Sequence, residues 1–168
     1  MSKDIKFISA AFLVSIVVIV GVAFVFSKKS SGDTEIPTTE VLGLTASPQS
    51  YDLGSVPISG GIVSRDYEIK NTTSGKLTLK KIATSCMCTT ARVKIGDKET
   101  RFFGMEMTGD KNAPVSLEIP AGESAKVTVN FDPAAHGPAG TGPFDRIVWL
   151  SFAQGMKELK FNGTVVAQ

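Results

Sequence analysis

Hydrophobic positions divide the chain into two parts with different patterns. Residues 7–26 form a predominantly apolar run that contains no charged side chain. A helix of about 20 apolar residues is long enough to cross the hydrocarbon core of a bilayer. The run therefore predicts one N-terminal transmembrane helix, and residues 1–29 are assigned to a membrane anchor.

A cleavable signal peptide is the alternative interpretation of this segment. The apolar part of a signal peptide usually has about 7 to 15 residues and ends at a small-residue cleavage site. The run in this chain is longer, and Lys28 and Lys29 follow it directly after Ser27. Both features favour an uncleaved anchor. The polar, aperiodic residues 30–42 are predicted to form a flexible linker, because they offer too little apolar surface to order themselves.

From residue 43 onward, polar and apolar residues alternate in short runs separated by Gly, Pro and Asn. A period of two is typical of strands with one buried face, and regular punctuation is typical of all-β domains. We expect residues 43–168 to form an immunoglobulin-like antiparallel β-sandwich of about 7 to 8 strands. The runs lie around Tyr51–Leu53, Val63–Ile69, Leu77–Ile82, Val93–Ile95, Val115–Ile119, Ala125–Phe131, Ile147–Phe152 and Leu159–Val166.

Charge adds information about location and partners. Lys3 and Lys6 precede the apolar run and Lys28 and Lys29 follow it, so the positive-inside comparison does not decide the orientation. A strand-rich domain with cysteines after a single apolar segment favours a single-pass protein of the cell membrane with its C-terminal domain outside the cytoplasm. Four of the 18 basic and one of the 16 acidic side chains lie in residues 1–29, which leaves 14 against 15. This balance argues against a nucleic-acid partner.

Several segments together resemble a known family of bacterial immunoglobulin-like domains, the domain of unknown function 1573, which is related to Hydin-type (ASH, MSP-like) sandwiches. The matching segments are YDLGSV (51–56), YEIKNTTSGKLTLKKI (67–82), TSCMCTT (84–90), IPAGESAKVTVNFDP (119–133) and LKFNGTV (159–165). The family usually has S-C-G-C-T where this chain has Met87 in place of the glycine, and this chain also inserts RFFGMEMTG. The resemblance implies the sandwich fold and carries over no activity.

The two cysteines, Cys86 and Cys88, have one residue between them. On an extended strand their side chains would share one face and Met87 would point away. Extended Cα atoms two residues apart are separated by about 6.6 Å, near the upper limit for a disulfide, so a bridge requires a bend. Three alternatives stay open: buried free thiols, a local disulfide, or metal binding.

The metal hypothesis depends on other soft ligands. Met105 and Met107 form a second pair with one residue between them, and His136 is the single histidine of the chain. Thiolate and thioether ligands select Cu(I). Cys86, Cys88, Met105, Met107 and His136 are therefore the candidate ligands of a Cu(I) site.

Catalytic motifs are missing from the sequence. One histidine limits the possible nucleophile–base pairs, and the chain has neither a nucleophile elbow nor a phosphate-binding glycine loop. We therefore expect a membrane-anchored extracytoplasmic domain that is not an enzyme and that binds a protein partner of the envelope or membrane. A copper-handling protein with Cu(I) as its cofactor is the alternative.

Overall fold

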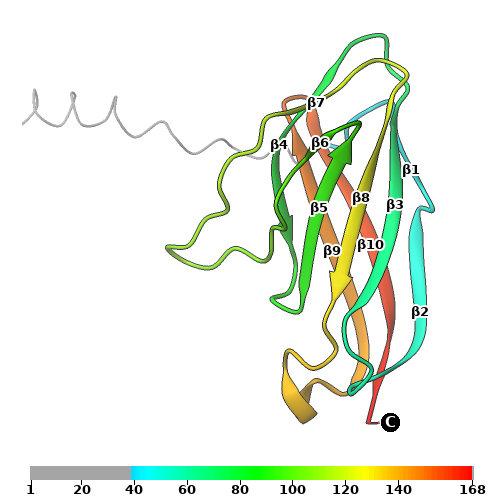
Figure 1. The fold of residues 1–168 in the computed structure, drawn as a ribbon, viewed down its shortest axis with the longest axis vertical. Helices are drawn as coiled ribbons and strands as arrows, with labels where there is room; N and C mark the ends of the chain where they lie inside the picture. Colours follow the sequence, from blue (N-terminus) through cyan, green and yellow to red (C-terminus); the bar gives the residue numbers. More distant parts are fainter. Residues whose placement is uncertain (1–38, 168) are drawn as a thin grey trace, which may run out of the picture. The chain divides into compact units, whose positions relative to one another are not determined.

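The computed structural model describes residues 39–167, and these residues form a two-layer β-sandwich (Figure 1). Ten strands and one short 3-10 helix make up this part of the chain. They are β1 (Leu44–Ser47), β2 (Ser50–Pro57), β3 (Val63–Asn71), β4 (Leu77–Thr84), β5 (Thr89–Ile95), β6 (Lys98–Glu99), β7 (Leu117–Ile119), β8 (Ser124–Phe131), η1 (Gly137–Gly140), β9 (Gly142–Phe152) and β10 (Gly155–Val166).

The strands form two sheets of five. One sheet has the order β1-β3-β8-β5-β6 and the other has the order β2-β10-β9-β4-β7. The all-β sandwich predicted from the alternation is confirmed. The structure has two more strands than the upper end of the prediction, because β1 and β6 are too short to produce a clear period-two pattern.

The prediction of a purely antiparallel sandwich is wrong in one place. β2 runs parallel to β10, with Ser50 opposite Lys160 and Val56 opposite Val165. The chain changes sheets between β1 and β2, so that β1 pairs with β3 while β2 joins the edge of the other sheet. A parallel pair needs a long connection, and β2 and β10 lie at opposite ends of the domain sequence.

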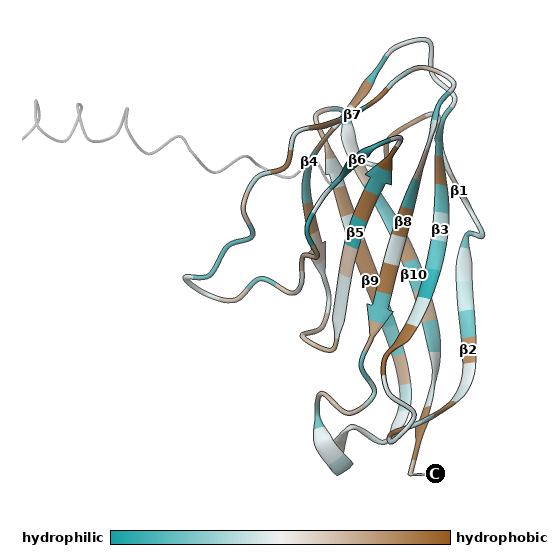
Figure 2. Cartoon of the chain, viewed as in Figure 1, coloured by the Kyte–Doolittle hydropathy of each residue, from teal (hydrophilic) through white to brown (hydrophobic). Residues whose placement is uncertain are grey.

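The core lies between the two sheets and follows the alternation of each strand. In β8, Ala125, Val127, Val129 and Phe131 are buried, and in β3, Tyr67 and Ile69 are buried. Figure 2 shows the same alternation as hydrophobic and hydrophilic bands along β5 and β8. Burying apolar area at roughly 25 cal/mol per Å² is the main stabilising contribution in such a domain.

Tyr67 links the two layers. Its ring is 1% exposed and packs edge-on against Tyr51, and its hydroxyl donates a hydrogen bond to the Lys160 carbonyl of β10 at 2.7 Å. Burial, with a smaller contribution from Tyr51, raises the pKa of the Tyr67 hydroxyl. The hydroxyl therefore stays protonated and keeps its role as a donor between the sheets.

The predicted anchor and most of the predicted linker lie outside the described residues. Within residues 39–167, no helix is long and apolar enough to span a membrane. The end of the linker range packs on the sandwich. Val41 is 3% exposed and donates its backbone N–H to the Met156 carbonyl, and Glu40 forms an ion pair with Lys157 at 2.7 Å.

Candidate functional site

The cysteines lie in a tight turn between β4 and β5, at the same end of the sandwich as η1 (Figure 1). The Thr89 N–H donates to the Cys86 carbonyl at 3.1 Å, which closes the turn. The buried Thr84 hydroxyl lies 3.0 Å from both the Cys86 and the Thr89 carbonyl oxygens. Thr84 and Thr89 are therefore the polar residues that hold the turn in shape.

A disulfide joins Cys86 and Cys88, whose Cα atoms are 5.2 Å apart. The bend that a bridge requires is supplied by the turn, so residues 85–88 are not the extended strand that the two-residue spacing suggested. Of the alternatives, the local disulfide is the state in this structure, and neither cysteine is a free thiol. The expected outward direction of Met87 is confirmed, since its side chain is 60% exposed while both cysteines are buried.

Strands β8 and β9 hold the disulfide turn against the rest of the sandwich. The Asp132 N–H, just after β8, donates to the Cys88 carbonyl at 2.8 Å. Ser85 is held on β9, because its N–H donates to the Ile147 carbonyl and its hydroxyl accepts from the Ile147 N–H, both at 2.9 Å. These contacts bring residues far from the cysteines in sequence next to the sulfurs.

Two basic side chains contact the two sulfurs separately. His136 Nε2, in the loop after β8, lies 3.2 Å from Cys86 Sγ. Arg146 Nε, on β9, donates to Cys88 Sγ at 3.2 Å. Cys86 is 7% exposed and Cys88 is 3% exposed, whereas His136 is exposed at the surface. The bridge is thus a shielded pair of sulfurs with a different neighbour at each end.

Three of the predicted ligands converge. Ligand atoms of Cys86, Cys88 and His136 lie within 4.8 Å of one another. In the oxidised state the sulfurs are bonded to each other. A metal would therefore require the reduced thiols, since the thiolate is the ligand form of cysteine. Two thiolates and one imidazole suit Cu(I) or, with a fourth ligand, Zn²⁺.

The predicted methionine ligands lie in the loop between β6 and β7, residues 100–116, which projects from the side of the sandwich (Figure 1). Gly104 of this loop lies beside the start of the disulfide turn, because its carbonyl accepts the Thr84 N–H at 3.3 Å. Met105 is 37% and Met107 is 59% exposed. Their assignment as copper ligands stays a prediction.

Polar contacts orient the β6–β7 loop. Glu106 Oε2 pairs with Lys81 Nζ at 2.6 Å, and Glu106 Oε1 accepts the Asn112 N–H at 2.8 Å. The Asn112 side-chain amide donates to the Ile82 and Gly104 carbonyls. Burial by itself raises the pKa of Glu106, but the bonds from Lys81 and Asn112 outweigh it and the pKa is lowered. Glu106 is thus fixed on the sandwich, and its neighbours Met105 and Met107 are left exposed.

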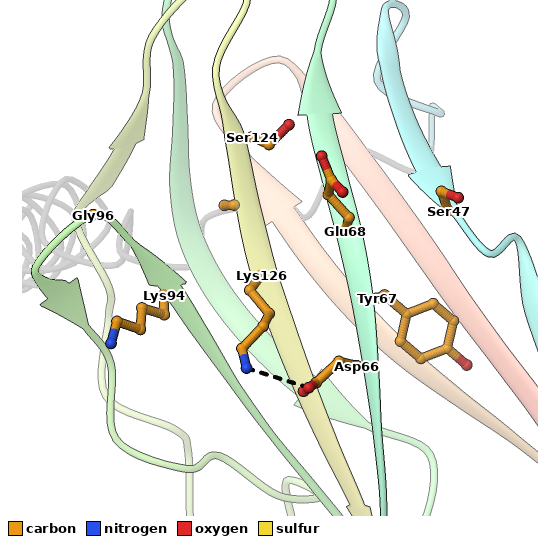
Figure 3. A pocket seen from close by; sticks show the side chains of 9 residues that line it. Ser47, Asp66, Tyr67, Glu68, Lys94, Gly96, Ser124 and Lys126 are labelled. Carbon is orange, nitrogen blue, oxygen red and sulfur yellow. Dashed lines mark hydrogen bonds and ion pairs between the residues drawn. The ribbon is translucent and has the colours of Figure 1, made fainter.

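A surface hollow lies elsewhere, on the outer face of β3 and β8. It has a volume of about 660 Å³, and Figure 3 shows Lys126 paired with Asp66 inside it. Lys94 and Gly96, which also line it, lie at the end of β5 that is opposite to the cysteines. Most of the residues that line it carry charged or hydroxyl side chains on the strand exterior, which is a poor match to the hydrophobic and aromatic side chains that line most ligand sites.

These features define the class of protein as an immunoglobulin-like β-sandwich with a disulfide turn at one end. Residues 44–101 match the model of a family described as protein of unknown function (DUF1573). The predicted resemblance to this family is confirmed, and the matched range contains the disulfide turn. A comparison with curated proteins finds no match.

Similarity to one solved structure supports the fold, and two other structures are similar with lower TM-scores. A protein of unknown function from Porphyromonas gingivalis W83 is similar with a TM-score of 0.51 and 17% identity over 80% of this chain. This chain spans 51% of that protein's length. The ASH/PapD-like domain 7 of human CEP192 has a TM-score of 0.43 and 16% identity, over 83% of this chain and 97% of the domain. The MSP family member WR4 from C. elegans has a TM-score of 0.38 and 13% identity, over 74% of this chain and 98% of that chain.

Sequence reasoning missed Arg146 and Thr84. Arg146 directly precedes the predicted strand Ile147–Phe152, and its 58-residue separation from Cys88 hides the contact. Thr84 stands two residues before Cys86 and carries a weak signal, because a threonine next to a turn often bonds local carbonyls. Asp132 stabilises the turn after β8, since its side chain accepts the Ala134 N–H at 2.9 Å.

Proposed function

We propose that this protein is a single-pass membrane protein whose extracytoplasmic immunoglobulin-like domain binds a protein partner of the cell envelope or membrane. The observation that carries the proposal is the β6–β7 loop. Phe102, Met105 and Met107, three of the six exposed large hydrophobic side chains among the described residues, lie within six consecutive positions of it. Exposed apolar residues gathered on a loop are typical of a contact surface.

The loop is held in place before any partner arrives. The ion pair of Glu106 with Lys81 and the Asn112 hydrogen bonds fix its backbone on β4, so little conformational entropy would be lost on binding. Arg92 lies over the Phe102 ring at 4.8 Å and limits the motion of that ring. Methionine side chains adapt to apolar partners of irregular shape. We infer that the partner offers an apolar patch of its own.

The proposed location rests on the sequence and on the disulfide. Residues 7–26 are long enough to anchor the chain, and residues 30–42 would tether the domain near the membrane surface. Disulfides persist outside the cytoplasm of most organisms. Retention of the full chain in membranes after an alkaline carbonate wash tests the anchor, and release into the wash would contradict it.

Affinity capture of binding partners from solubilised membranes, with the tagged full chain as bait, tests the binding surface. The tagged full chain is compared with the double variant Met105→Ser/Met107→Ser and with the control Leu42→Ser/Ile62→Ser, which alters exposed apolar residues elsewhere. We expect a partner that the wild type and the control recover alike and that the loop variant recovers at least about tenfold less, as hot-spot losses predict. Equal recovery by all three proteins, or recovery of no specific partner, would remove the proposal.

Copper handling is the second candidate, supported by the convergence of Cys86, Cys88 and His136. Native mass spectrometry of the reduced full chain with Cu(I) tests it. We expect one Cu(I) per chain, lost in Cys86→Ser/Cys88→Ser and weakened in His136→Ala. The Met105→Ser/Met107→Ser variant tests whether the methionines take part. Failure of the reduced wild type to bind Cu(I) removes this candidate and leaves the loop proposal standing.

A further inference from the structure

The surroundings of the disulfide point to an activity beyond partner or copper binding. We propose that the Cys86–Cys88 bridge exchanges with an external thiol, with Cys86 as the sulfur that is attacked and Cys88 as the sulfur that leaves. The substrate class is a dithiol, from a small molecule or from a protein, outside the cytoplasm. The proposal rests on the unequal contacts of the two sulfurs.

Arg146 identifies the leaving sulfur. Its Nε donates to Cys88 Sγ at 3.2 Å, its Nη1 donates to the Asp145 carbonyl at 2.8 Å, and its guanidinium lies 5.7 Å from the centre of the Phe144 ring. Arg146 takes part in none of the ion pairs of residues 39–167. A guanidinium gains little from a neutral disulfide sulfur, but it forms a charge-assisted hydrogen bond with a thiolate. The negative charge that develops in exchange is therefore best stabilised on Cys88.

Access identifies the attacked sulfur. Cys88 is the more buried cysteine, and its backbone carbonyl and sulfur are both engaged by β8 and β9 through Asp132 and Arg146. Cys86 Sγ lies 3.2 Å from Nε2 of the exposed His136. His136 belongs to the segment 133–142, which includes two proline residues and three glycine residues. A thiol that displaces the imidazole reaches Cys86 Sγ first.

The exchange balances in two steps. A thiolate of the external dithiol attacks Cys86 Sγ and forms a mixed disulfide; the Cys86–Cys88 bond breaks and its electron pair stays on Cys88 as a thiolate next to Arg146. The second thiolate of the reductant then attacks its own sulfur in the mixed disulfide and releases Cys86. Two electrons pass to the protein, the dithiol becomes a disulfide, and the two protons of the dithiol end on the two cysteines or in solvent.

The small ring argues against a purely structural bridge. Cys86 and Cys88 are separated by two positions, and the chain-entropy relation assigns a three-residue ring only about a third of the stabilisation of a hundred-residue ring. The turn is also closed by hydrogen bonds from Thr84 and Thr89. The domain can therefore keep its fold while the bridge opens and closes.

Trapping the mixed disulfide tests the direction of the exchange without any variant. The oxidised full chain, with a chelator present to exclude metals, is treated with glutathione, quenched with an alkylating agent and mapped by mass spectrometry. The chain contains two cysteines, so the assignment is unambiguous. We expect glutathione on Cys86 and the alkyl group on Cys88. The reverse pattern, or a bridge that glutathione and dithiothreitol leave intact in the folded protein, would overturn the proposal.

Rate measurements test the role of Arg146 as a positioning residue. Arg146→Met is expected to slow reduction by dithiothreitol about tenfold, Arg146→Lys is expected to recover part of the rate, and the control Arg101→Met, which removes another arginine stacked on a phenylalanine, is expected to leave it unchanged. An equal rate in wild type and Arg146→Met, with both proteins folded by circular dichroism, would contradict the assignment. Because these assays contain neither copper nor a partner protein, a negative result would leave the proposals of partner binding and copper handling unaffected.

Discussion

Asn71 illustrates at the residue scale how one buried polar side chain holds two turns together. It is fully buried at the end of β3, and its amide nitrogen donates to the Gly75, Ile119 and Pro120 carbonyls. Its side-chain oxygen accepts hydrogen bonds from the Thr73 backbone and hydroxyl. The residue therefore joins the β3–β4 turn to the end of β7.

Replacing Asn71 by Ala should destabilise the domain by about 3 kcal/mol, because it removes the side-chain donor to the buried Ile119 carbonyl and the side-chain acceptor of the Thr73 N–H. Urea denaturation measures the change. Asn162→Ala, which alters an exposed asparagine on β10, is the matched control and should change the free energy of unfolding by less than about 0.5 kcal/mol. Similar losses in the two variants would show that the Asn71 contacts contribute little.

The same network shows the limit of residue-level prediction. The segment NTTSG after β3 is recognisable as a turn, since these residue types favour turns. That the Asn71 amide reaches carbonyls 48 and 49 positions away depends on where β7 lies in the sandwich. The pattern of residues near Asn71 contains no such information.

At the scale of elements, the β6–β7 loop combines a polar side facing the sandwich with an exposed apolar side. Glu106 and its partner Lys81 are mostly covered, with side-chain exposures of 16% and 24%. An ion pair with this degree of cover, supported by a backbone hydrogen bond, contributes more than a fully exposed pair. The loop position should therefore depend on the charge of Glu106.

Acidification should release this contact. The pKa of Glu106 is lowered from its ordinary value of 4.5 in the folded protein, so its stabilising contribution is present above pH 4.5 and is lost as the pH falls through the folded pKa. Glu106→Gln should lower the free energy of unfolding by about 1 kcal/mol at pH 7, and this difference should shrink as the pH falls below 4.5. Urea midpoints measured across this pH range provide the measurement.

Glu68→Gln on the exposed face of β3 serves as the control for this titration. It removes another carboxylate from the surface and should change the free energy of unfolding at pH 7 by less than about 0.5 kcal/mol. If Glu106→Gln differs from the wild type by the same amount at pH 7 and pH 3, then the charge of Glu106 does not hold the loop.

At the scale of the whole molecule, stability comes from the packing between the two sheets. Large side chains from both sheets are fully buried, including Tyr67 and Ile69 from one and Leu150 and Leu159 from the other. The disulfide closes a ring of three residues, and the chain-entropy relation gives about 1.6 kcal/mol for such a ring. The fold should therefore survive reduction.

Reduction of the full chain should lower the free energy of unfolding by no more than about 2 kcal/mol, with the secondary structure unchanged. Urea denaturation and far-ultraviolet circular dichroism with and without a reductant test this expectation. The Cys86→Ser/Cys88→Ser variant should behave like the reduced protein. Unfolding on reduction would instead assign the bridge a structural role. It would count against the proposal that the bridge is reduced and re-formed in the folded protein.

The sequence by itself determined the order and approximate limits of the main strands and the sandwich class. Alternation with a period of two is a local property, because successive side chains of a strand face opposite sides wherever the strand lies. The resemblance to the DUF1573 family was visible for the same reason, since its segments are short and contiguous. Cys86 and Cys88 were recognisable as a pair from their spacing alone.

Only the tertiary structure decided what surrounds that pair. The parallel pairing of β2 with β10, the bend that joins the two sulfurs, and the contacts of His136 and Arg146 from 50 and 58 positions away all depend on how the sheets stack and where their loops end. Such contacts arise from packing between segments distant in sequence, and local residue patterns do not encode them individually. The chemistry proposed for the disulfide therefore follows from the fold, although the cysteines themselves were visible from the start.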